Sequence, residues 1–331
     1  MKKILMIGTG GTIASEVTQD GLAPELTSAQ LLEHIPAISG ICEVECIQLL
    51  SLDSTNMQPR HWLMMAQCIK EHYEEYDGFV LTHGTDTMAY TAAALSYLVQ
   101  ESPKPIILTG AQKPIGFDST DSKINLLDAF RCAAEDLPGV SIVFNNKVIP
   151  GTRAKKTRSK SFQAFSSINY PYLGVLRDGT LLRYIRPECG ERAVFYDTLN
   201  TKVALLKLTP GATREMADFL LERNDALIIE SFGVGGLPEE GGFYECLEQW
   251  MEQGRIVVLT TQVENEGSDL GVYHVGYRLK RDLRVLEAYD MTTEAVVAKL
   301  MWLLGQTRDR QEIERRFYTP VAKDILWEQI Y

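Results

Sequence analysis

Short apolar runs recur along this chain and alternate with stretches of helical periodicity. They lie at residues 4–7, 79–81, 105–109 and 140–144, and again at 203–206, 226–229 and 256–259. Runs of this length, bounded by glycine or polar residues, are typical of buried β-strands. Strands that alternate with helices pack as a parallel, doubly wound sheet. The sequence therefore predicts an α/β fold with a mostly parallel, Rossmann-like sheet.

A stretch without periodicity divides the chain into two parts. Residues 183–202 contain Pro187, Gly190 and charges of both signs, a composition typical of a linker between domains. We therefore predict a larger N-terminal α/β domain over 1–182, a linker over 183–202 and a smaller C-terminal α/β domain over 203–331.

The composition argues against several classes of protein. No apolar run reaches the length of about 18 residues that a membrane-spanning helix needs, and the start of the chain lacks the apolar segment of a signal peptide. The 33 basic and 44 acidic residues give a net charge of −11, which disfavours binding to nucleic acid or anionic membranes. The six cysteines and five histidines show no metal-binding spacing. We expect a cytoplasmic protein with free thiols and no metal site.

The first apolar run ends in a glycine-rich loop that carries a hydroxyl group. Gly8-Thr9-Gly10-Gly11-Thr12 follows residues 4–7 directly. Glycines let the backbone turn sharply and approach a ligand, and ligands of open α/β sheets bind at the carboxyl ends of strands. A phosphate-binding loop is a weak alternative because the spacing does not match G-x-G-x-x-G. Taken alone, the stretch fits an ordinary strand-to-loop turn equally well.

A later strand repeats this design. Thr82-His83-Gly84-Thr85-Asp86 follows residues 79–81 and precedes a predicted helix. Two strand ends thus each present a threonine, and the second adds a carboxylate.

The motifs Thr9-Gly10-Gly11-Thr12-Ile13-Ala14 and His83-Gly84-Thr85-Asp86-Thr87 resemble the L-asparaginase family, the bacterial type I enzymes in particular. Both motifs stand in the right order and spacing, and the resemblance covers nearly the whole chain. It implies hydrolysis of the side-chain amide of L-asparagine to L-aspartate and ammonia, without a metal ion or organic cofactor. It also implies a homo-oligomer, either a homodimer or a homotetramer.

The resemblance implies four catalytic residues. Thr12 would attack the amide and form a β-aspartyl ester, and Thr85 would activate water for the second step with the help of Lys156 and Asp86. Asp86 would also pair with the α-ammonium group of the substrate. Lysine can act as a base only where burial and neighbouring charge lower its pKa. The assignment of Lys156 rests on motif spacing, and the adjacent Lys155 is the alternative.

Two further segments resemble the family's substrate-binding motifs. Asp53-Ser54-Thr55-Asn56-Met57 is similar to Asp-Ser-Ser-Asn-Met, and a serine beside backbone donors suits an α-carboxylate. An ordinary helix N-cap cluster is the alternative interpretation. Gly110-Ala111-Gln112 resembles a segment whose carbonyl near Ala111 meets the substrate amide. The implied substrate-binding residues are Asp53, Ser54, Thr55, Gly84 and Ala111.

The chain departs from the family pattern at two positions near the implied site. Residues 15–24 read as an exposed, mobile loop corresponding to the family's lid, and many members carry a tyrosine there where this chain has Leu22. Gly236 follows a stretch similar to Ser-Tyr-Gly-Val-Gly, where the family has asparagine. In the family this region of a neighbouring subunit completes the site. Acidic candidates to reach the substrate ammonium are Glu264, Glu266 and Asp269.

Regulation by a second asparagine occurs in some type I enzymes, at an effector site that uses an arginine and a cysteine. The corresponding positions here are Glu230 and Val263. A carboxylate opposite the carboxylate of the effector repels it. We therefore expect no cooperative response to asparagine.

Three alternative functions remain at this point. A component of a tRNA-dependent amidotransferase shares the motifs but carries an additional N-terminal domain, whereas the first motif here begins at residue 8. A catalytically weak amino-acid sensor is suggested by Leu22 and Gly236. A nucleotide-binding module lacks a phosphate-binding fingerprint.

Overall fold

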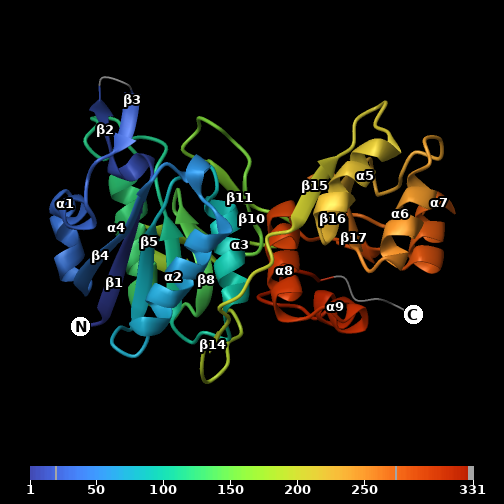
Figure 1. Ribbon diagram of the computed structural model, residues 1–331. Helices are drawn as coiled ribbons and strands as arrows, with labels where there is room; N and C mark the ends of the chain where they lie inside the picture. Colours follow the sequence, from blue (N-terminus) through green and yellow to red (C-terminus); the bar gives the residue numbers. More distant parts are fainter. Residues whose placement is uncertain (19–20, 273, 327–331) are drawn as a thin grey trace. The chain divides into compact units, whose positions relative to one another are not determined.

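The computed structural model describes residues 1–18, 21–272 and 274–326. The chain divides into two compact units, Met1–Asp197 and Thr198–Tyr331 (Figure 1). Each unit combines helices with its own sheet, so the predicted two-part α/β architecture is confirmed. No helix within the described residues is long and apolar enough to cross a membrane.

The N-terminal unit is built on an eight-stranded sheet with the order β13-β12-β9-β8-β7-β5-β1-β4. The strands from β4 to β8 in this order pair in parallel, as predicted, and the others extend the sheet in antiparallel pairs. Their bounds are Lys3–Gly10 (β1), Glu43–Leu52 (β4), Gly78–Thr82 (β5), Pro105–Thr109 (β7), Gly139–Phe144 (β8), Lys147–Pro150 (β9), Gly174–Arg177 (β12) and Thr180–Arg183 (β13).

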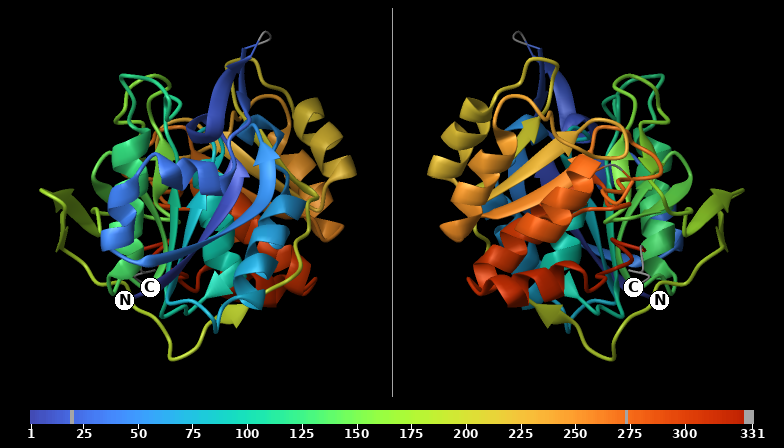
Figure 2. Two further views of the ribbon diagram at one scale, coloured as in Figure 1. Left: turned by 90° about the vertical axis from the view of Figure 1, so that its left-hand side faces the viewer. Right: turned by 90° about the vertical axis from the view of Figure 1, so that its right-hand side faces the viewer.

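Helices cover both faces of this sheet (Figure 2). Helix α4 (Ser122–Ala134) packs on the face that carries Val80, whereas Phe79, its neighbour in β5, stacks on Tyr73 just after α2 (Pro59–Glu71). Successive residues of a strand point to opposite faces, so α2 lies on the face opposite α4. Helix α3 (Met88–Leu98) packs against α2 and the sheet, and α1 (Ser28–Glu33) lies beside β4.

Smaller elements complete the N-terminal unit. Three 3-10 helices occupy Thr12–Ala14 (η1), Pro36–Gly40 (η2) and Ser54–Asn56 (η3). Two hairpins pair Ser15–Thr18 (β2) with Gly21–Pro24 (β3), and Ala154–Lys156 (β10) with Phe165–Ser167 (β11). Strand β14 (Val194–Phe195) lies within the predicted linker and pairs with β6 (Val99–Gln100).

The predicted mobile loop over residues 15–24 is thus largely a hairpin. Leu22 pairs with Val17 through its backbone. Residues 19 and 20 and the side chain of Leu22 lie outside the described part of the chain.

The C-terminal unit contains a four-stranded parallel sheet, β15-β16-β17-β18, which covers Val203–Lys207, Ala226–Ser231, Ile256–Thr261 and Leu286–Glu287. Its helices are Arg214–Arg223 (α5), Phe243–Glu252 (α6), His274–Arg278 (α7), the π-helix Leu279–Leu283 (η4), Thr293–Gln306 (α8) and Arg310–Phe317 (α9). A buried ion pair joins Lys299 of α8 to Asp324, with the Nζ and Oδ2 atoms 2.7 Å apart.

Candidate active site

Glycines let the loops after β1, β4 and β5 approach one another closely at the carboxyl edge of the N-terminal sheet. A Cβ atom on Gly11 would lie 2.3 Å from the backbone nitrogen of Gly84, and one on Gly84 would lie 2.5 Å from the hydroxyl oxygen of Ser54. Gly11 also has a φ of 82°, which favours glycine. Thr12 and Thr85 each follow one of these touching glycines, so the fold brings both threonines to one place.

Thr85 lies at the centre of a hydrogen-bonded group. Its Oγ1 atom accepts a hydrogen bond of 2.8 Å from Nζ of Lys156 and donates one of 3.2 Å to Oε1 of Gln112. The same ammonium group lies 2.6 Å from Oδ1 of Asp86. Thr85 is buried and the Lys156 side chain is 17% exposed, whereas the Asp86 carboxylate is 56% exposed. The Asp86 carboxylate is therefore the member of this group that is most accessible to a ligand.

The structure separates the two lysines that the sequence left as alternatives. Lys156 lies in β10 opposite Phe165, and Lys155 lies opposite Ser166. Neighbouring residues of a strand point to opposite faces. Lys156 contacts Thr85 and Asp86, whereas the side chain of Lys155 makes no hydrogen bond or ion pair with any residue that the structure describes.

The predicted carboxylate-binding segment lies against the turn that carries Asp86. The hydroxyl of buried Ser54 accepts a hydrogen bond of 3.3 Å from the backbone nitrogen of Asp86, and the carbonyl of Ser54 accepts one of 2.8 Å from Thr87. Asp53 caps the short helix η3 through the backbone and hydroxyl groups of Thr55. Asp53 therefore makes the contacts of an N-cap, and Ser54 lies against the turn that carries Asp86.

The loop after β7 packs against the turn that precedes Thr85. A Cβ atom on Gly110 would lie 2.2 Å from the carbonyl oxygen of His83, whose backbone nitrogen donates to Thr109. Ala111 follows and is fully buried. Gln112 was not predicted as a site residue, although it stands in the segment that identified Ala111. Its contact with Thr85 depends on the pairing of β7 with β5, which no local pattern of the sequence encodes.

His83 is buried beneath this turn in a chain of hydrogen bonds. Nε1 of Trp62 donates to Oγ1 of Thr91, and Oγ1 of Thr91 lies 2.9 Å from Nε2 of His83. The other ring nitrogen, Nδ1, lies 2.7 Å from the carbonyl oxygen of Gly84. A carbonyl only accepts, so Nδ1 carries the proton and Nε2 accepts from Thr91. Burial lowers the pKa of His83 from 6.5 to about 4.

This lowered pKa predicts a loss of stability in mild acid. Between pH 6.5 and about 4 the unfolded chain takes up a proton at His83 and the folded chain does not, so the free energy of unfolding falls as the pH falls. The contribution is about 1.4 kcal/mol per pH unit. Urea denaturation at several pH values should show that the stability of His83→Gln depends less on pH than that of the wild type. His34→Gln, at an exposed helix end, is the control. The prediction would be contradicted if the free energies of unfolding of the wild type and H83Q differed by the same amount at every pH in this range.

The remaining predicted residues lie in the C-terminal unit. Glu264 and Glu266 are exposed in the loop after β17, and the backbone nitrogen of Asp269 donates to the carbonyl of Val234. Gly236 has a φ of 147° and open space where a side chain would begin. Buried Glu230 accepts a hydrogen bond of 2.6 Å from Thr293 at the start of α8.

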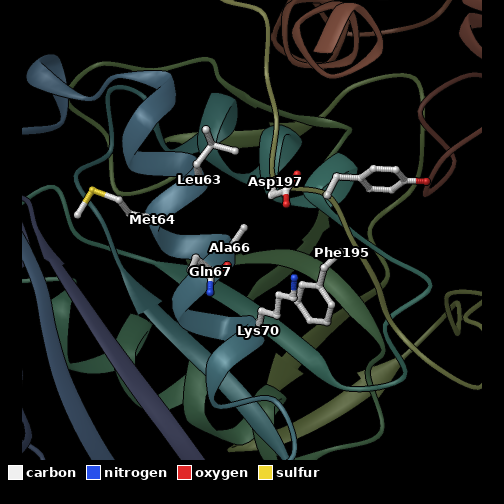
Figure 3. A pocket seen from close by; sticks show the side chains of 8 residues that line it. Leu63, Met64, Ala66, Gln67, Lys70, Phe195 and Asp197 are labelled. Atoms are coloured by element: carbon white, nitrogen blue, oxygen red, sulfur yellow. The ribbon is translucent and has the colours of Figure 1, made fainter. Parts of the chain in front are cut away.

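No group of three or more metal-ligating side chains occurs among the described residues. A cavity of about 320 Å³ lies elsewhere in the N-terminal unit, between α2 and the segment around β14 (Figure 3). It is lined by Leu63, Met64, Ala66, Gln67, Lys70, Phe195, Tyr196 and Asp197. None of the predicted site residues contributes to it.

Comparisons with known families cover almost the whole chain. Residues 3–188 match the family model described as "Asparaginase, N-terminal", and residues 202–317 match "Glutaminase/Asparaginase C-terminal domain". These two matches span both units of the fold.

Known proteins agree with the family models. The chain is 38% identical to an L-asparaginase of Thermococcus kodakarensis, over 98% of this chain and 99% of the relative. It is 34% identical to L-asparaginase 1 of Escherichia coli over 95% of each. The solved structure of the thermostable T. kodakarensis L-asparaginase superposes with a TM-score of 0.92 at 36% identity, covering 98% of this chain and all of that one. One component of the glutamyl-tRNA(Gln) amidotransferase of Pyrococcus furiosus is 32% identical, over 97% of this chain and 76% of the relative.

Proposed function

The chain belongs to the asparaginase family, and on this premise we propose that it hydrolyses the side-chain amide of L-asparagine to L-aspartate and ammonia. The observation that carries the proposal is the contact of Lys156 with both Thr85 and Asp86, at the point where the Thr12 loop meets the Thr85 loop.

In the first step, the hydroxyl oxygen of Thr12 attacks the carbon of the side-chain amide. The hydroxyl proton of Thr12 is transferred to the amide nitrogen, the carbon–nitrogen bond breaks, ammonia leaves, and a β-aspartyl ester with Thr12 forms. Backbone N–H groups of the two glycine-rich turns stabilise the negative charge that develops on the carbonyl oxygen. Splitting the hydrolysis of an amide into two easier steps is the advantage of a covalent intermediate.

In the second step, water attacks the ester and releases aspartate. The hydroxyl of Thr85 contacts Nζ of Lys156. With Lys156 acting as a neutral amine, this hydroxyl turns from Gln112 to donate its proton to the amine and takes a proton from the attacking water. The proton then passes from Lys156 to the oxygen of Thr12 as the ester bond breaks, which regenerates the Thr12 hydroxyl. Asp86, exposed at the edge of the group, pairs with the α-ammonium group of the substrate. Ser54, which contacts the Asp86 turn, receives the α-carboxylate.

An assay of ammonia release tests this function directly. The purified protein should release ammonia from L-asparagine in the absence of any tRNA or partner protein, and none in buffer alone. L-glutamine in a parallel reaction measures how strictly the site selects the shorter side chain. Absence of release from asparagine would refute the proposal and favour a binding protein. Release that requires tRNA would favour the amidotransferase function that one relative carries in its name.

We expect the active protein to be a homodimer or homotetramer. In the resembling family a neighbouring subunit completes the site, and closed symmetric assemblies are the usual form of soluble oligomers. Light scattering on samples with measured activity should give a mass of at least twice 37.2 kDa. A monomeric mass in fully active samples would contradict this expectation.

We also expect a hyperbolic response to asparagine, with a Hill coefficient of about one. The carboxylate of Glu230 accepts a hydrogen bond from Thr293, and the ammonium group of the largely exposed Lys207 lies 3.9 Å away. A buried carboxylate in this position repels the carboxylate of an effector, and cooperativity through an effector needs a second bound ligand. Initial rates over a wide range of asparagine concentration measure the coefficient. A value clearly above one would show that an effector site exists despite Glu230.

A further inference from the structure

We propose that Asp121 and Asn125 form a positioning pair that holds the loop of residues 110–113 against Thr85. This inference rests on the proposed hydrolysis, because its purpose is to fix groups that act on the substrate. Asp121 stands at the N-cap of α4, and Asn125 lies one turn into the helix. Both side chains are buried, with 7% and 1% of their surfaces exposed.

The carboxylate of Asp121 binds the loop through its backbone. The nitrogen of Gln112 lies 3.1 and 3.0 Å from the two carboxylate oxygens, and the nitrogen of Lys113 lies 3.1 Å from Oδ1. The amide nitrogen of Asn125 donates a further hydrogen bond of 3.1 Å to Oδ2. Two successive backbone N–H groups of the loop are therefore directed at one carboxylate.

Asn125 joins this carboxylate to two strand ends. Its Nδ2 atom also donates to the carbonyl of Gly110, 3.0 Å away, just after β7. Its Oδ1 atom accepts a hydrogen bond of 2.9 Å from the backbone nitrogen of Asn145, just after β8. The hydroxyl groups of Ser122 and Thr120 both donate to the carbonyl of Lys113. Hydrogen bonds thus hold the loop at both ends, at Gly110 and at Lys113, to residues at the start of α4.

The charge of Asp121 is balanced without a cation. The described residues give it no ion pair, and its hydrogen-bond donors are the backbone N–H groups of Gln112 and Lys113 and the side-chain amide of Asn125. A buried carboxylate is costly unless hydrogen bonds satisfy it, and hydrogen bonds to a charged acceptor are shorter and stronger than neutral ones. An ionised group here therefore holds the loop more rigidly than a neutral amide would.

The held loop carries two groups of the candidate site. Gln112 accepts the hydrogen bond from Thr85, and the backbone of Ala111 was predicted to meet the substrate amide. A misplacement of about 1 Å at a reacting centre can cost about 100-fold in rate. Loosening the loop should therefore lower kcat with little effect on KM, because substrate binding uses Ser54 and Asp86 on other loops.

Asp121→Asn tests the proposal, with Asp128→Asn as the matched control. Asp128 is similarly buried on the same helix but accepts its hydrogen bond from Arg131, and among the described residues it has no hydrogen bond with the loop. We expect D121N to lower kcat for asparagine by about 10- to 100-fold while KM changes less than about threefold. D128N should lower the melting temperature and leave kcat within twofold of the wild type. If D121N does not fold, Asn125→Ala should show the same separation of kcat from KM.

Amide hydrogen exchange gives a second measurement that does not depend on activity. The N–H groups of Gln112 and Lys113 should exchange at least about tenfold faster in D121N than in the wild type or in D128N. Unchanged exchange and unchanged kcat in D121N would overturn the positioning role. A wild-type protein that releases no ammonia, but whose loop loses protection in D121N, would instead refute the proposed hydrolysis and leave the structural link intact.

Discussion

Replacing Thr12 or Thr85 by alanine is expected to lower kcat for asparagine by about two to four orders of magnitude, the range for loss of a nucleophile or of its activation. The two hydroxyls follow glycines that touch each other, and Thr85 receives a hydrogen bond from Lys156. Neither alanine variant should unfold, because each change removes only one hydroxyl and one methyl group.

The two variants should fail at different steps. Thr12→Ala removes the nucleophile, so no covalent intermediate can form. Thr85→Ala leaves the nucleophile and slows the attack of water, so the β-aspartyl ester should accumulate. Mass spectrometry of samples quenched with acid during turnover would detect one added aspartyl group in T85A and none in T12A.

Thr9→Ala is the matched control for both. Thr9 stands three residues before Thr12, is buried, and donates a hydrogen bond of 2.7 Å to the carbonyl of Thr82. Its loss should cost about 1 kcal/mol of stability with little change in kcat. Near-wild-type turnover in a folded T12A or T85A would show that the residue has a different role.

Local sequence patterns predicted the framework of this site well. The apolar run at residues 4–7 and its glycine-rich end indicated a buried strand and a sharp turn, and β1 ends in that turn. The same reasoning gave β5, β7 and β8 and the helices between them, because strand and helix periodicities are properties of short stretches.

Features that depend on distant partners could not be predicted in the same way. Strand β14 pairs with β6, about a hundred residues earlier in the chain, and its composition resembles that of a loop. Gln112 reaches Thr85 only because β7 lies beside β5. The buried state of His83 follows from α2 and α3 packing over one turn. Each of these contacts is set by tertiary packing, which overrides local preference.

Sequence reasoning identified two adjacent lysines, Lys155 and Lys156, but could not decide which of them contacts Thr85. Motif spacing predicted a catalytic lysine at position 156, with position 155 as the alternative. Adjacent residues of a strand point to opposite faces. An uncertainty of one residue therefore leaves open whether the lysine faces Thr85 or points away from it. The pairing of β10 with β11 directs Lys156 to Thr85 and Asp86.

Lys156→Met is therefore expected to reduce kcat by about two to four orders of magnitude, the range for loss of a general acid or base. Methionine keeps most of the length and the apolar stem of lysine but removes the group that contacts Oγ1 of Thr85 and Oδ1 of Asp86. The thermal stability should change little, since the Asp86 carboxylate is more than half exposed and stays hydrated without its partner.

Lys155→Met provides the control on the adjacent residue of the same strand. It removes an equal charge from β10, so any effect of net charge on substrate attraction is the same in both variants. Its ammonium group makes no contact with the described residues of the site, and kcat should stay within about twofold of the wild type. Ammonia release measured at saturating asparagine distinguishes the role of Lys156 from that of Lys155. Loss of turnover in K155M with retention in K156M would transfer the role to Lys155 and would mean that the Lys156–Thr85 contact has no part in the reaction.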